Sequence, residues 1–284
     1  MSRSEWHRPQ VEMPSDKRRI ALTVSYDGRF WHGWQVQENA DSVEGEIEKA
    51  LSSVLGEEVF VQGSGRTDAG VHALGQVAHF DTSSSIPPEK YSIILNTMLP
   101  KSIRILSSWE PRGVFHARFT AMAREYWYFL KRMDQMLPFD EGRVTGIREL
   151  PDISLLNSYA SLIQGTHDFT TFCSARDMCQ SRKRDIYESV WNTERDKYGF
   201  PVYRYRVAGN AFLYRQVRSM VGTMVEAALA GEEVSRFKAR LDGKDRSLAL
   251  KTAPSDGLYL ARISYDENEY IWFEEGLDGR QQDT

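Results

Sequence analysis

The chain has 284 residues, of which 41% are hydrophobic and 27% charged, and its formal net charge at pH 7 is −4. This composition is that of a globular protein and excludes a low-complexity chain. No apolar run is long enough to span a membrane, and residues 1–19 lack the apolar core of a signal peptide. We therefore expect a cytoplasmic protein with no membrane partner, in which Cys173 and Cys179 are reduced thiols. With His167 they would offer at most three metal ligands, so no metal site is expected.

The negative charge is concentrated at the C-terminal end of the chain. From Asp266 onward there are seven acidic residues and one arginine, a net charge of −6, so the preceding residues together carry +2 (−4 minus −6). Basic residues in that part cluster at 17–19, at 182–184, and at Arg204 with Arg206. Such clusters are ordinarily solvated surface, but they also permit contact with nucleic-acid phosphates.

The first half of the chain has the hydrophobic pattern of a βαββαβ unit. Apolar residues alternate from Ile20 to Tyr26, which predicts a strand, and Ser42 can cap a helix that ends at Gly56. The remaining expected elements are strands at 59–62 and 76–80, a helix from about 87 to 98, and a strand at 103–109.

The second half repeats this order. A strand is expected around Tyr126, Tyr128 and Leu130, and Ser154 can cap a helix that ends at Gly165. The remaining expected elements are strands at 186–193 and 202–207, a long helix at 212–230 closed by Gly231, and a strand at 258–263.

Two such units predict an α+β fold of two ferredoxin-like βαββαβ halves, whose sheets join side by side and leave a cleft between them. We place the boundary near residues 115–121. The expected domains are a disordered N-terminal extension at 1–16, halves at 17–118 and 119–275, and an acidic tail at 276–284.

The most informative segment is the glycine-rich stretch from Gly63 to Ala73, which reads GSGRTDAGVHA. Glycine permits sharp bends and a close approach of the backbone to a ligand, so Asp68 could meet a substrate, with Arg66 as a charge partner. The stretch lacks the lysine of a P-loop and the spacing of a dinucleotide fingerprint. From these residues alone, a hairpin with a solvated aspartate is an equally good interpretation.

The motif GRTDAGVHA at 65–73 resembles the active-site motif of the tRNA pseudouridine synthase A family, whose aspartate is catalytic. Three further segments resemble the same family in the same order, and together the resemblance covers about residues 18–265. They are Tyr26 to Gly28 with Gly33 to Gln37, Arg124 to Tyr128, and Phe212 to Arg218. The resemblance implies the duplicated fold, tRNA as substrate, modification at positions 38–40 of the anticodon arm, and a homodimer.

Pseudouridine formation breaks the C1′–N1 bond of uridine and rejoins the uracil through C5. The atom count does not change, so no metal, nucleotide or other cofactor is expected. A carboxylate can stabilise positive charge at the anomeric carbon, attack that carbon, or remove a neighbouring proton. Asp68 is the candidate, as nucleophile at C1′ or as base at C2′. To stay ionised in a cleft without water it needs a fixed cation.

Arg218 is the candidate cation, because arginine stays charged and can grip a carboxylate with two parallel hydrogen bonds. It belongs to a helical row with Tyr214, Val221 and Val225 that is otherwise largely apolar. A structural ion pair within the core would also place an arginine there. Similarity to the helix arginine of the family favours support of catalysis.

Aromatic and basic residues supply candidate contacts to RNA. Tyr126 matches the active-site tyrosine of the family, which lies against the target base, whereas Tyr128 is expected in the core. Arg66 resembles the arginine that displaces or replaces the flipped base, although a surface charge on a hairpin would have the same pattern. Arg182 and Arg184 are expected to contact phosphates.

Two further groups of residues have alternative interpretations. Residues His32 to Gln35 are expected in a loop that contacts RNA or a second subunit, or else in a loop anchored by a buried Trp34. His72 and His79 could exchange protons, but hydrogen bonding within the core or a loop is the ordinary interpretation of a histidine.

Two rival functions are compatible with parts of the sequence. A non-catalytic RNA-binding module of ferredoxin-like type explains the aromatic and basic residues, but not an aspartate in a glycine loop. A hydrolase would use Asp68 as acid or base with a second carboxylate, and Asp27 and Asp81 are available without a recognisable arrangement. The sequence therefore favours an isomerase, a tRNA pseudouridine synthase.

Overall fold

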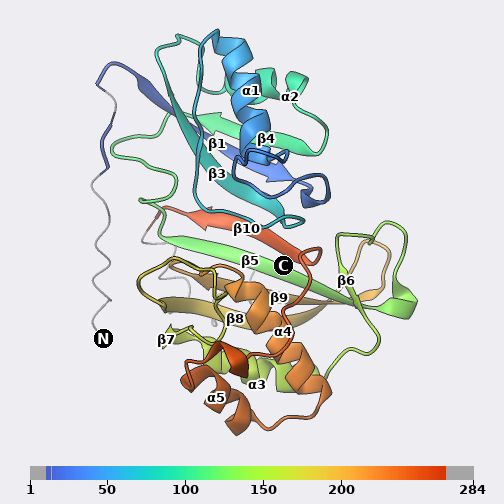
Figure 1. The fold of residues 1–284 in the computed structure, drawn as a ribbon. Helices are drawn as coiled ribbons and strands as arrows, with labels where there is room; N and C mark the ends of the chain where they lie inside the picture. The colour runs from blue at the N-terminus through green and yellow to red at the C-terminus, as the bar shows by residue number, and fades with distance from the viewer. Residues whose placement is uncertain (1–10, 14, 267–284) are drawn as a thin grey trace, which may run out of the picture. The chain divides into compact units, whose positions relative to one another are not determined.

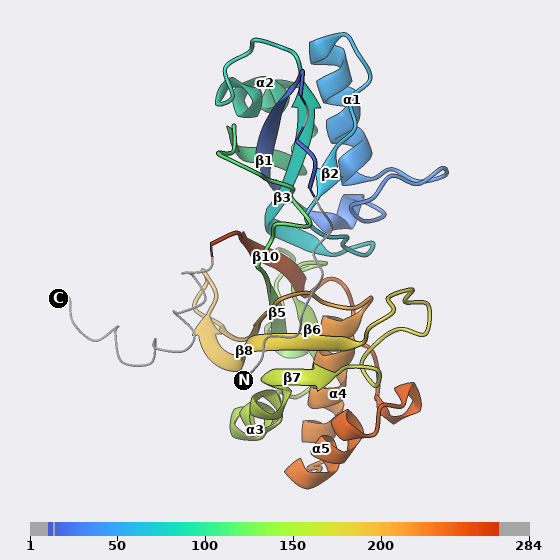
Figure 2. The same ribbon diagram turned by 90° about the vertical axis from the view of Figure 1, so that its left-hand side faces the viewer.

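The computed structural model describes residues 11–13 and 15–266, and the chain divides into two compact units between Ala121 and Met122. Figures 1 and 2 show these units in two orientations. The expected acidic tail at 276–284 and most of the expected extension at 1–16 lie outside the described residues. No helix in the described part has the length and apolar character that a membrane span requires.

Unit 1 consists of helices and an antiparallel sheet in which the described strands have the order β4-β1-β3-β2. Its elements are β1 (Arg18–Tyr26), α1 (Val43–Leu55), β2 (Gln62–Gly63), β3 (His72–Thr82), α2 (Lys90–Met98) and β4 (Ile103–Trp109). A 3-10 helix, Gly28–Phe30, follows β1. The chain order βαββαβ with the sheet order 4-1-3-2 is the ferredoxin-like arrangement that the sequence predicts.

Helix α1 begins and ends where the sequence predicts. The Ser42 hydroxyl accepts a hydrogen bond from the Gly45 N–H at 3.2 Å, which caps the first turn. Gly56 has a left-handed conformation (φ 70°), which a glycine adopts without strain and which ends the helix. Ile47 and Leu51 of this helix are fully buried. Burial of each such side chain contributes about 1.5–3 kcal/mol.

Strand β2 is shorter than predicted: it begins at Gln62, the last residue of the expected range 59–62. The N–H groups of Val59 and Val61 donate to side chains of α1, namely to Ser52 Oγ (3.1 Å) and to Glu48 Oε1 (2.8 Å). These backbone groups are therefore satisfied by a helix rather than by a neighbouring strand. Pairing with β3 begins only after these residues.

Unit 2 has the same arrangement with additions. Its strand order is β10-β5-β9-β8-β7, antiparallel between β10 and β7, with β6 parallel to β5. Its elements are β5 (Ala123–Arg132), β6 (Thr145–Ile147), α3 (Ile153–Ile163), β7 (Gly165–Asp168), β8 (Lys183–Arg195), β9 (Pro201–Gly209), α4 (Gln216–Leu229), α5 (Val234–Asp242) and β10 (Leu258–Ser264). Strands β10, β5, β9 and β8 give the order 4-1-3-2 again, so the predicted duplication is confirmed.

Both predicted limits of helix α3 are wrong. Helix α3 is capped by Asp152, whose carboxylate accepts the Ser154 N–H at 2.7 Å, so Ser154 lies inside the helix. The helix ends at Ile163, and Gly165 opens β7 instead of closing α3. The sequence does not separate the two candidate caps, because Asp152 and Ser154 are only two positions apart and both residue types can cap a helix.

Helix α4 begins at Gln216 rather than at 212. Arg215 has a left-handed backbone (φ 61°), which cannot continue into the preceding residues as a right-handed helix. Tyr214 therefore lies outside the helical row in which the sequence analysis placed it. The remainder of that row is correct, since Val221 and Val225 are buried on α4.

Helix α5 and strands β6 and β7 are not foreseen by the sequence pattern. Two of the nine residues of α5, Phe237 and Leu241, are buried. Its apolar stripe is therefore too narrow to be recognised as a helix from the hydrophobic pattern. Strand β7 has four residues, none of them fully buried. Figures 1 and 2 show α3, α4 and α5 gathered against the sheet of unit 2.

Candidate functional site

The glycine-rich loop connects β2 to β3 in unit 1, as predicted. Its first residues are tied to β3, because the Ser64 N–H donates to the Val77 carbonyl at 2.8 Å. The side chain of Gln76 accepts from the Ser64 hydroxyl at 2.5 Å and donates to the Gly65 carbonyl at 2.7 Å. Both side chains in this pair are buried. The loop is therefore held by its own strand rather than free to move as a surface hairpin.

Asp68 is half-buried, and its carbonyl accepts the Val71 N–H at 3.1 Å in a turn that leads into β3. The residue before it, Thr67, is buried, and its hydroxyl is hydrogen-bonded to the Tyr26 hydroxyl at 2.7 Å. The aspartate is thus presented by a fixed backbone, so it is not the mobile solvated residue of a simple hairpin.

The segment His32 to Gln35 packs beside this loop. The Trp34 N–H donates to the Thr67 carbonyl at 3.2 Å, and Trp34 itself is 2% exposed. Its indole N–H donates to Glu44 at 2.9 Å. The interpretation with a buried, anchoring Trp34 is therefore the one that the structure supports. His32 is exposed.

Two glycines permit the close approach of these segments. Gly33 has φ +99°, and a Cβ atom there would lie 2.5 Å from the Thr67 carbonyl oxygen. A Cβ atom at Gly28 would lie 2.2 Å from the Val71 carbonyl oxygen. Neither position can carry a side chain without displacing the backbone of the loop that bears Asp68.

His72 and His79 both serve as hydrogen-bond acceptors in the interior of unit 1. His72 Nδ1 accepts the Gly28 N–H at 3.1 Å, and His79 Nδ1 accepts the Ala117 N–H at 3.2 Å. Burial, with the nearby charge of Arg19, lowers the pKa of His79 to about 3. His79 is therefore neutral at physiological pH.

The two candidates for the second carboxylate of a hydrolase, Asp27 and Asp81, are each paired with an arginine. Asp81 makes two hydrogen bonds with Arg19, at 2.7 and 2.8 Å. Asp27 pairs with Arg29 at 2.7 Å; burial alone would raise the pKa of Asp27, but the bonds from Arg29 outweigh it and lower that pKa to about 2. Both groups are structural ion pairs, which removes the support for the hydrolase.

Arg66 is exposed on the same loop, two residues before Asp68. Glu44 is half-buried, and burial raises the pKa of its carboxyl, while the positive charge of Arg66 acts in the opposite direction. The sequence analysis did not identify Glu44 as a residue that supports this loop. Its position in the first turn of α1, directly after the buried Val43, is the feature that could have indicated it.

Tyr126 lies on β5 of unit 2, paired with Val207 of β9 and Leu260 of β10. It is half-buried, and its ring meets the ring of Phe212 edge to face, with centroids 5.2 Å apart. Tyr128, two residues on, is fully buried, with its hydroxyl 2.7 Å from Thr145 Oγ1. The predicted assignment of Tyr128 to the core is confirmed.

Arg218 lies in the first turn of α4 and is half-buried. Its Nε donates to the Ala253 carbonyl at 2.8 Å, and its own carbonyl accepts the Ala253 N–H at 3.0 Å. Asp68 thus belongs to unit 1, whereas Tyr126 and Arg218 belong to unit 2.

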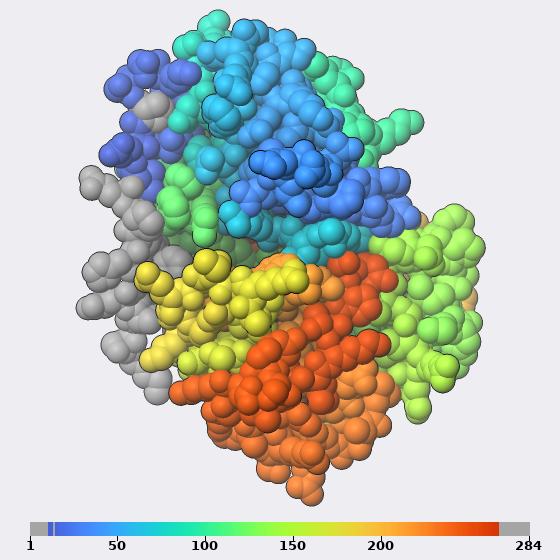
Figure 3. Space-filling view, in the orientation of Figure 1, coloured from blue at the N-terminus to red at the C-terminus, as the bar shows by residue number. Residues whose placement is uncertain are grey.

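Arg182 directly precedes β8, and Arg184 is the second residue of that strand. Both follow the largely exposed segment 175–181, which contributes to the surface of unit 2 (yellow in Figure 3). Arg182 is half-buried and contacts Cys173 Sγ and the Asp177 carbonyl. Arg184 is 4% exposed and donates to the carbonyls of Ser181 and Lys183 at 3.0 and 2.6 Å. Arg184 is therefore buried and binds backbone carbonyls of its own segment, which does not support the predicted contact with a phosphate.

Asp177 ties this segment to the turn before α4. Its carboxylate accepts the N–H groups of Tyr214 (2.6 Å) and Cys179 (2.7 Å). Burial alone would raise the pKa of Asp177, but these donors and the charge of Arg182 outweigh it and lower that pKa. The residues near the start of α4 are therefore fixed from outside the helix.

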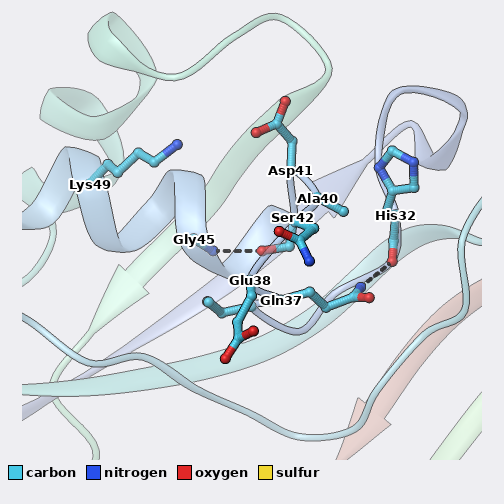
Figure 4. A pocket seen from close by; sticks show the side chains of 10 residues that line it. His32, Gln37, Glu38, Ala40, Asp41, Ser42, Gly45 and Lys49 are labelled. Carbon is cyan, nitrogen blue, oxygen red and sulfur yellow. Dashed lines mark hydrogen bonds between the residues drawn. The ribbon is translucent and has the colours of Figure 1, made fainter.

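A pocket of about 460 Å³ opens on unit 1 between the segment 32–42 and α1. Figure 4 shows that His32, Glu38, Asp41 and Lys49 line it. None of the predicted catalytic residues lines this pocket. Among residues 11–13 and 15–266 there is also no group of three or more His, Cys, Asp or Glu side chains that could hold a metal ion.

Two ferredoxin-like units, one with an aspartate on a hydrogen-bonded glycine loop, are the arrangement that the resemblance to pseudouridine synthases implies. The family model for tRNA pseudouridine synthase matches residues 20–120 and 159–266, and the chain belongs to this family. It is an isomerase family, whose members convert uridine to pseudouridine.

The chain aligns with similar proteins over nearly their whole length. A protein of Ruminiclostridium cellulolyticum is 39% identical over 248 residues, which are 87% of this chain and 100% of the relative. A protein of Bacillus subtilis is 38% identical over 250 residues, 87% of this chain and 99% of the relative. One of Borreliella burgdorferi is 37% identical over 250 residues, 88% and 100% of the two chains. Each is named tRNA pseudouridine synthase A.

Proposed function

We propose that this protein converts uridine to pseudouridine in tRNA, at positions 38–40 of the anticodon arm, with Asp68 as the catalytic residue. The observation that carries the proposal is the fixed loop that presents Asp68, inside a segment that the family model matches. A non-catalytic RNA-binding module would need no such support for one carboxylate.

The reaction breaks the C1′–N1 bond, forms a C1′–C5 bond, and moves one proton from C5 to N1. Asp68 attacks C1′ to give a covalent ester, or it removes the C2′ proton to give a glycal; both routes return the carboxylate unchanged. The loop geometry is compatible with either route, because each needs one ionised carboxylate held against the ribose.

Three further side chains have proposed roles. Arg218 is the cation that keeps Asp68 ionised, and its Nε bond to Ala253 fixes the plane of the guanidinium for that purpose. Tyr126 lies against the flipped base, since a half-buried ring on a strand can replace the stacking that the base loses. Arg66 is exposed on the loop and enters the space that the base leaves.

Binding of the tRNA body depends on phosphate contacts, for which Arg182 beside the exposed segment 175–181 is a candidate. We also propose a cytoplasmic homodimer, with each tRNA contacting both subunits. The resemblance to the family is the support for this assembly.

The test is conversion of uridine in tRNA transcripts by purified protein, with pseudouridine mapped by position. We expect conversion at 38–40 in the presence of EDTA and complete loss of turnover in Asp68→Asn and Asp68→Ala. The tRNA dissociation constants of both variants should stay within about tenfold of wild type, because phosphate contacts supply most of the affinity.

Asp41→Asn is the matched control, since Asp41 is an exposed aspartate of the same unit. It should leave turnover unchanged. Tight tRNA binding by the wild-type protein without any conversion would instead identify an RNA-binding module. Substantial turnover in Asp68→Asn would contradict the proposed role of Asp68.

A further inference from the structure

We propose that Tyr26 and Trp34 are positioning residues for Asp68, which they hold in place through Thr67. This inference rests on the proposed catalytic role of Asp68. Neither side chain can act on the substrate directly, because Tyr26 is 4% exposed and Trp34 is 2% exposed. Their influence on the reaction is through the backbone that carries the aspartate.

Thr67 is held at two different points. Its hydroxyl is paired with the Tyr26 hydroxyl at 2.7 Å, and its carbonyl accepts the Trp34 N–H at 3.2 Å. This carbonyl belongs to the peptide group that joins Thr67 to Asp68. The hydrogen bond from Trp34 therefore fixes the orientation of the peptide plane directly before the aspartate. Two anchors on one residue restrict both its position and its orientation.

The two anchoring residues also support each other. Their ring centroids lie 6.0 Å apart, so displacement of one ring would also displace the other. Tyr26 is the last residue of β1, which places it at the rim of the sheet rather than on a mobile connection. The support of Thr67 is therefore built on a regular strand.

Trp34 is fixed by helix α1 and by the glycine loop itself. Glu44 accepts hydrogen bonds from the Trp34 indole N–H (2.9 Å) and from the Val36 N–H (3.1 Å), and its own N–H donates to the Trp34 carbonyl at 2.9 Å. A Cβ atom at Gly63 would lie 2.4 Å from the indole nitrogen, so the ring packs directly on the loop backbone. The ring and backbone of Trp34 are both immobilised.

These contacts give a continuous path from α1 to the aspartate. It runs from Glu44 to Trp34, then to Thr67, and ends at Asp68. A catalytic group displaced by about 1 Å can lose on the order of 100-fold in rate. Loss of either anchor should therefore lower the chemical rate while tRNA binding, which uses other residues, is retained.

The experiment compares Tyr26→Phe, Thr67→Val and the double variant by single-turnover kinetics with saturating enzyme. Each single substitution deletes one hydroxyl of the same hydrogen bond. We expect each to slow the single-turnover rate roughly tenfold or more and to leave tRNA affinity within about twofold. The double variant should be no more than about twofold slower than the slower single variant, because both substitutions remove the same hydrogen bond.

Two controls separate positioning from a general loss of structure. Tyr91 is a fully buried tyrosine of the same unit, and Tyr91→Phe should match wild type in rate. Thr67→Ser keeps the hydroxyl and should restore most of the rate lost in Thr67→Val. Thermal melts accompany every variant, and rates are measured well below the lowest melting temperature.

The outcomes of this comparison are distinguishable. If Asp68→Asn is inactive but Tyr26→Phe and Thr67→Val both match wild type, the positioning inference is overturned and the proposed function stands. Multiplicative effects of the two substitutions would also overturn it, since independent effects exclude a shared bond. If Asp68→Asn retains turnover, the proposed function fails first, and with it the inference.

Discussion

Arg218 and Ala253 are joined by two hydrogen bonds, one from the side chain of the arginine to the alanine carbonyl and one from the alanine N–H to the arginine carbonyl. The segment that contains Ala253 can approach α4 this closely because residue 222 is a glycine. A Cβ atom at Gly222 would lie 1.9 Å from the Lys251 carbonyl oxygen. The orientation of the Arg218 guanidinium therefore depends on a close contact one helical turn away.

The substitution Gly222→Ala should accordingly affect both stability and turnover. The added methyl group must displace the 251–253 backbone, and such overpacking costs typically 1–3 kcal/mol, about as much as a moderate core truncation. We expect a lower melting temperature together with a single-turnover rate that falls although the protein is folded. Glu226→Ala, at an exposed position of the same helix, should change neither quantity. A stable Gly222→Ala protein with wild-type rate would show that Arg218 does not rely on this contact.

Replacement of Arg218 itself should separate its charge from its geometry. Arg218→Lys keeps the positive charge but has no donor at the position of Nε, so the bond to the Ala253 carbonyl is lost. We expect both variants to be slower than wild type in single-turnover assays, and Arg218→Ala to be slower than Arg218→Lys. Arg236→Ala, at an exposed arginine on α5, is the control. Wild-type rate and melting temperature in Arg218→Ala would disprove the role of this residue.

Tyr126 tests whether the ring or its hydroxyl is needed. Tyr126→Phe keeps the edge-to-face contact with Phe212 and a face for the base, so tRNA binding should be retained while the single-turnover rate falls strongly. Tyr126→Ala should in addition lose capture of the flipped base, because base stacking on an aromatic ring contributes about 1–3 kcal/mol. Tyr198→Phe, at an exposed tyrosine of unit 2, is the matched control. A Tyr126→Phe rate within a few-fold of wild type would leave stacking as its sole function.

The low pKa of His79 predicts a loss of stability in acid. In the unfolded chain this histidine binds a proton below its ordinary pKa of 6.5, whereas in the folded protein burial and Arg19 keep it neutral down to about 3. Between these values the unfolded state binds more protons, so the free energy of unfolding falls as the pH falls, by at most about 1.4 kcal/mol per pH unit.

Chemical denaturation at several pH values between 6.5 and about 3 measures this slope. His79→Gln should have a shallower slope than wild type. Some acid sensitivity should persist, because burial also lowers the pKa of the neighbouring His116. His32→Gln, at an exposed histidine, should keep the wild-type slope. Parallel slopes in His79→Gln and wild type would contradict a neutral, buried His79.

The fold was predictable from the sequence wherever local signals and burial agree. Strand β4 has the predicted limits, 103–109, and α1 has its predicted cap and terminating glycine. Prediction failed where a contact distant in sequence decides the structure. Val59 bonds to a side chain of α1 instead of a strand, and Arg215 takes a left-handed backbone that no helix propensity reveals.

The candidate site was likewise predictable in part. The position of Asp68 on a glycine loop followed from composition and motif. The support of that loop by Tyr26 and Trp34 did not, because it depends on how β1 and α1 are brought beside it. The pattern of basic residues was least informative, since charge alone does not show that Arg184 is covered.

The sheet order has a consequence for synthesis on the ribosome. In unit 1 the last strand of the sheet is β4, which ends at Trp109. This sheet can therefore form while the remainder of the chain is still being made. In unit 2 the first strand, β5, has β10 as one neighbour, and β10 begins only at Leu258. Strand β6 covers that edge only at residues 130–132, so residues 123–128 of β5 have no partner there until β10 has been made. During that time this part of the edge can pair with strands of other nascent chains.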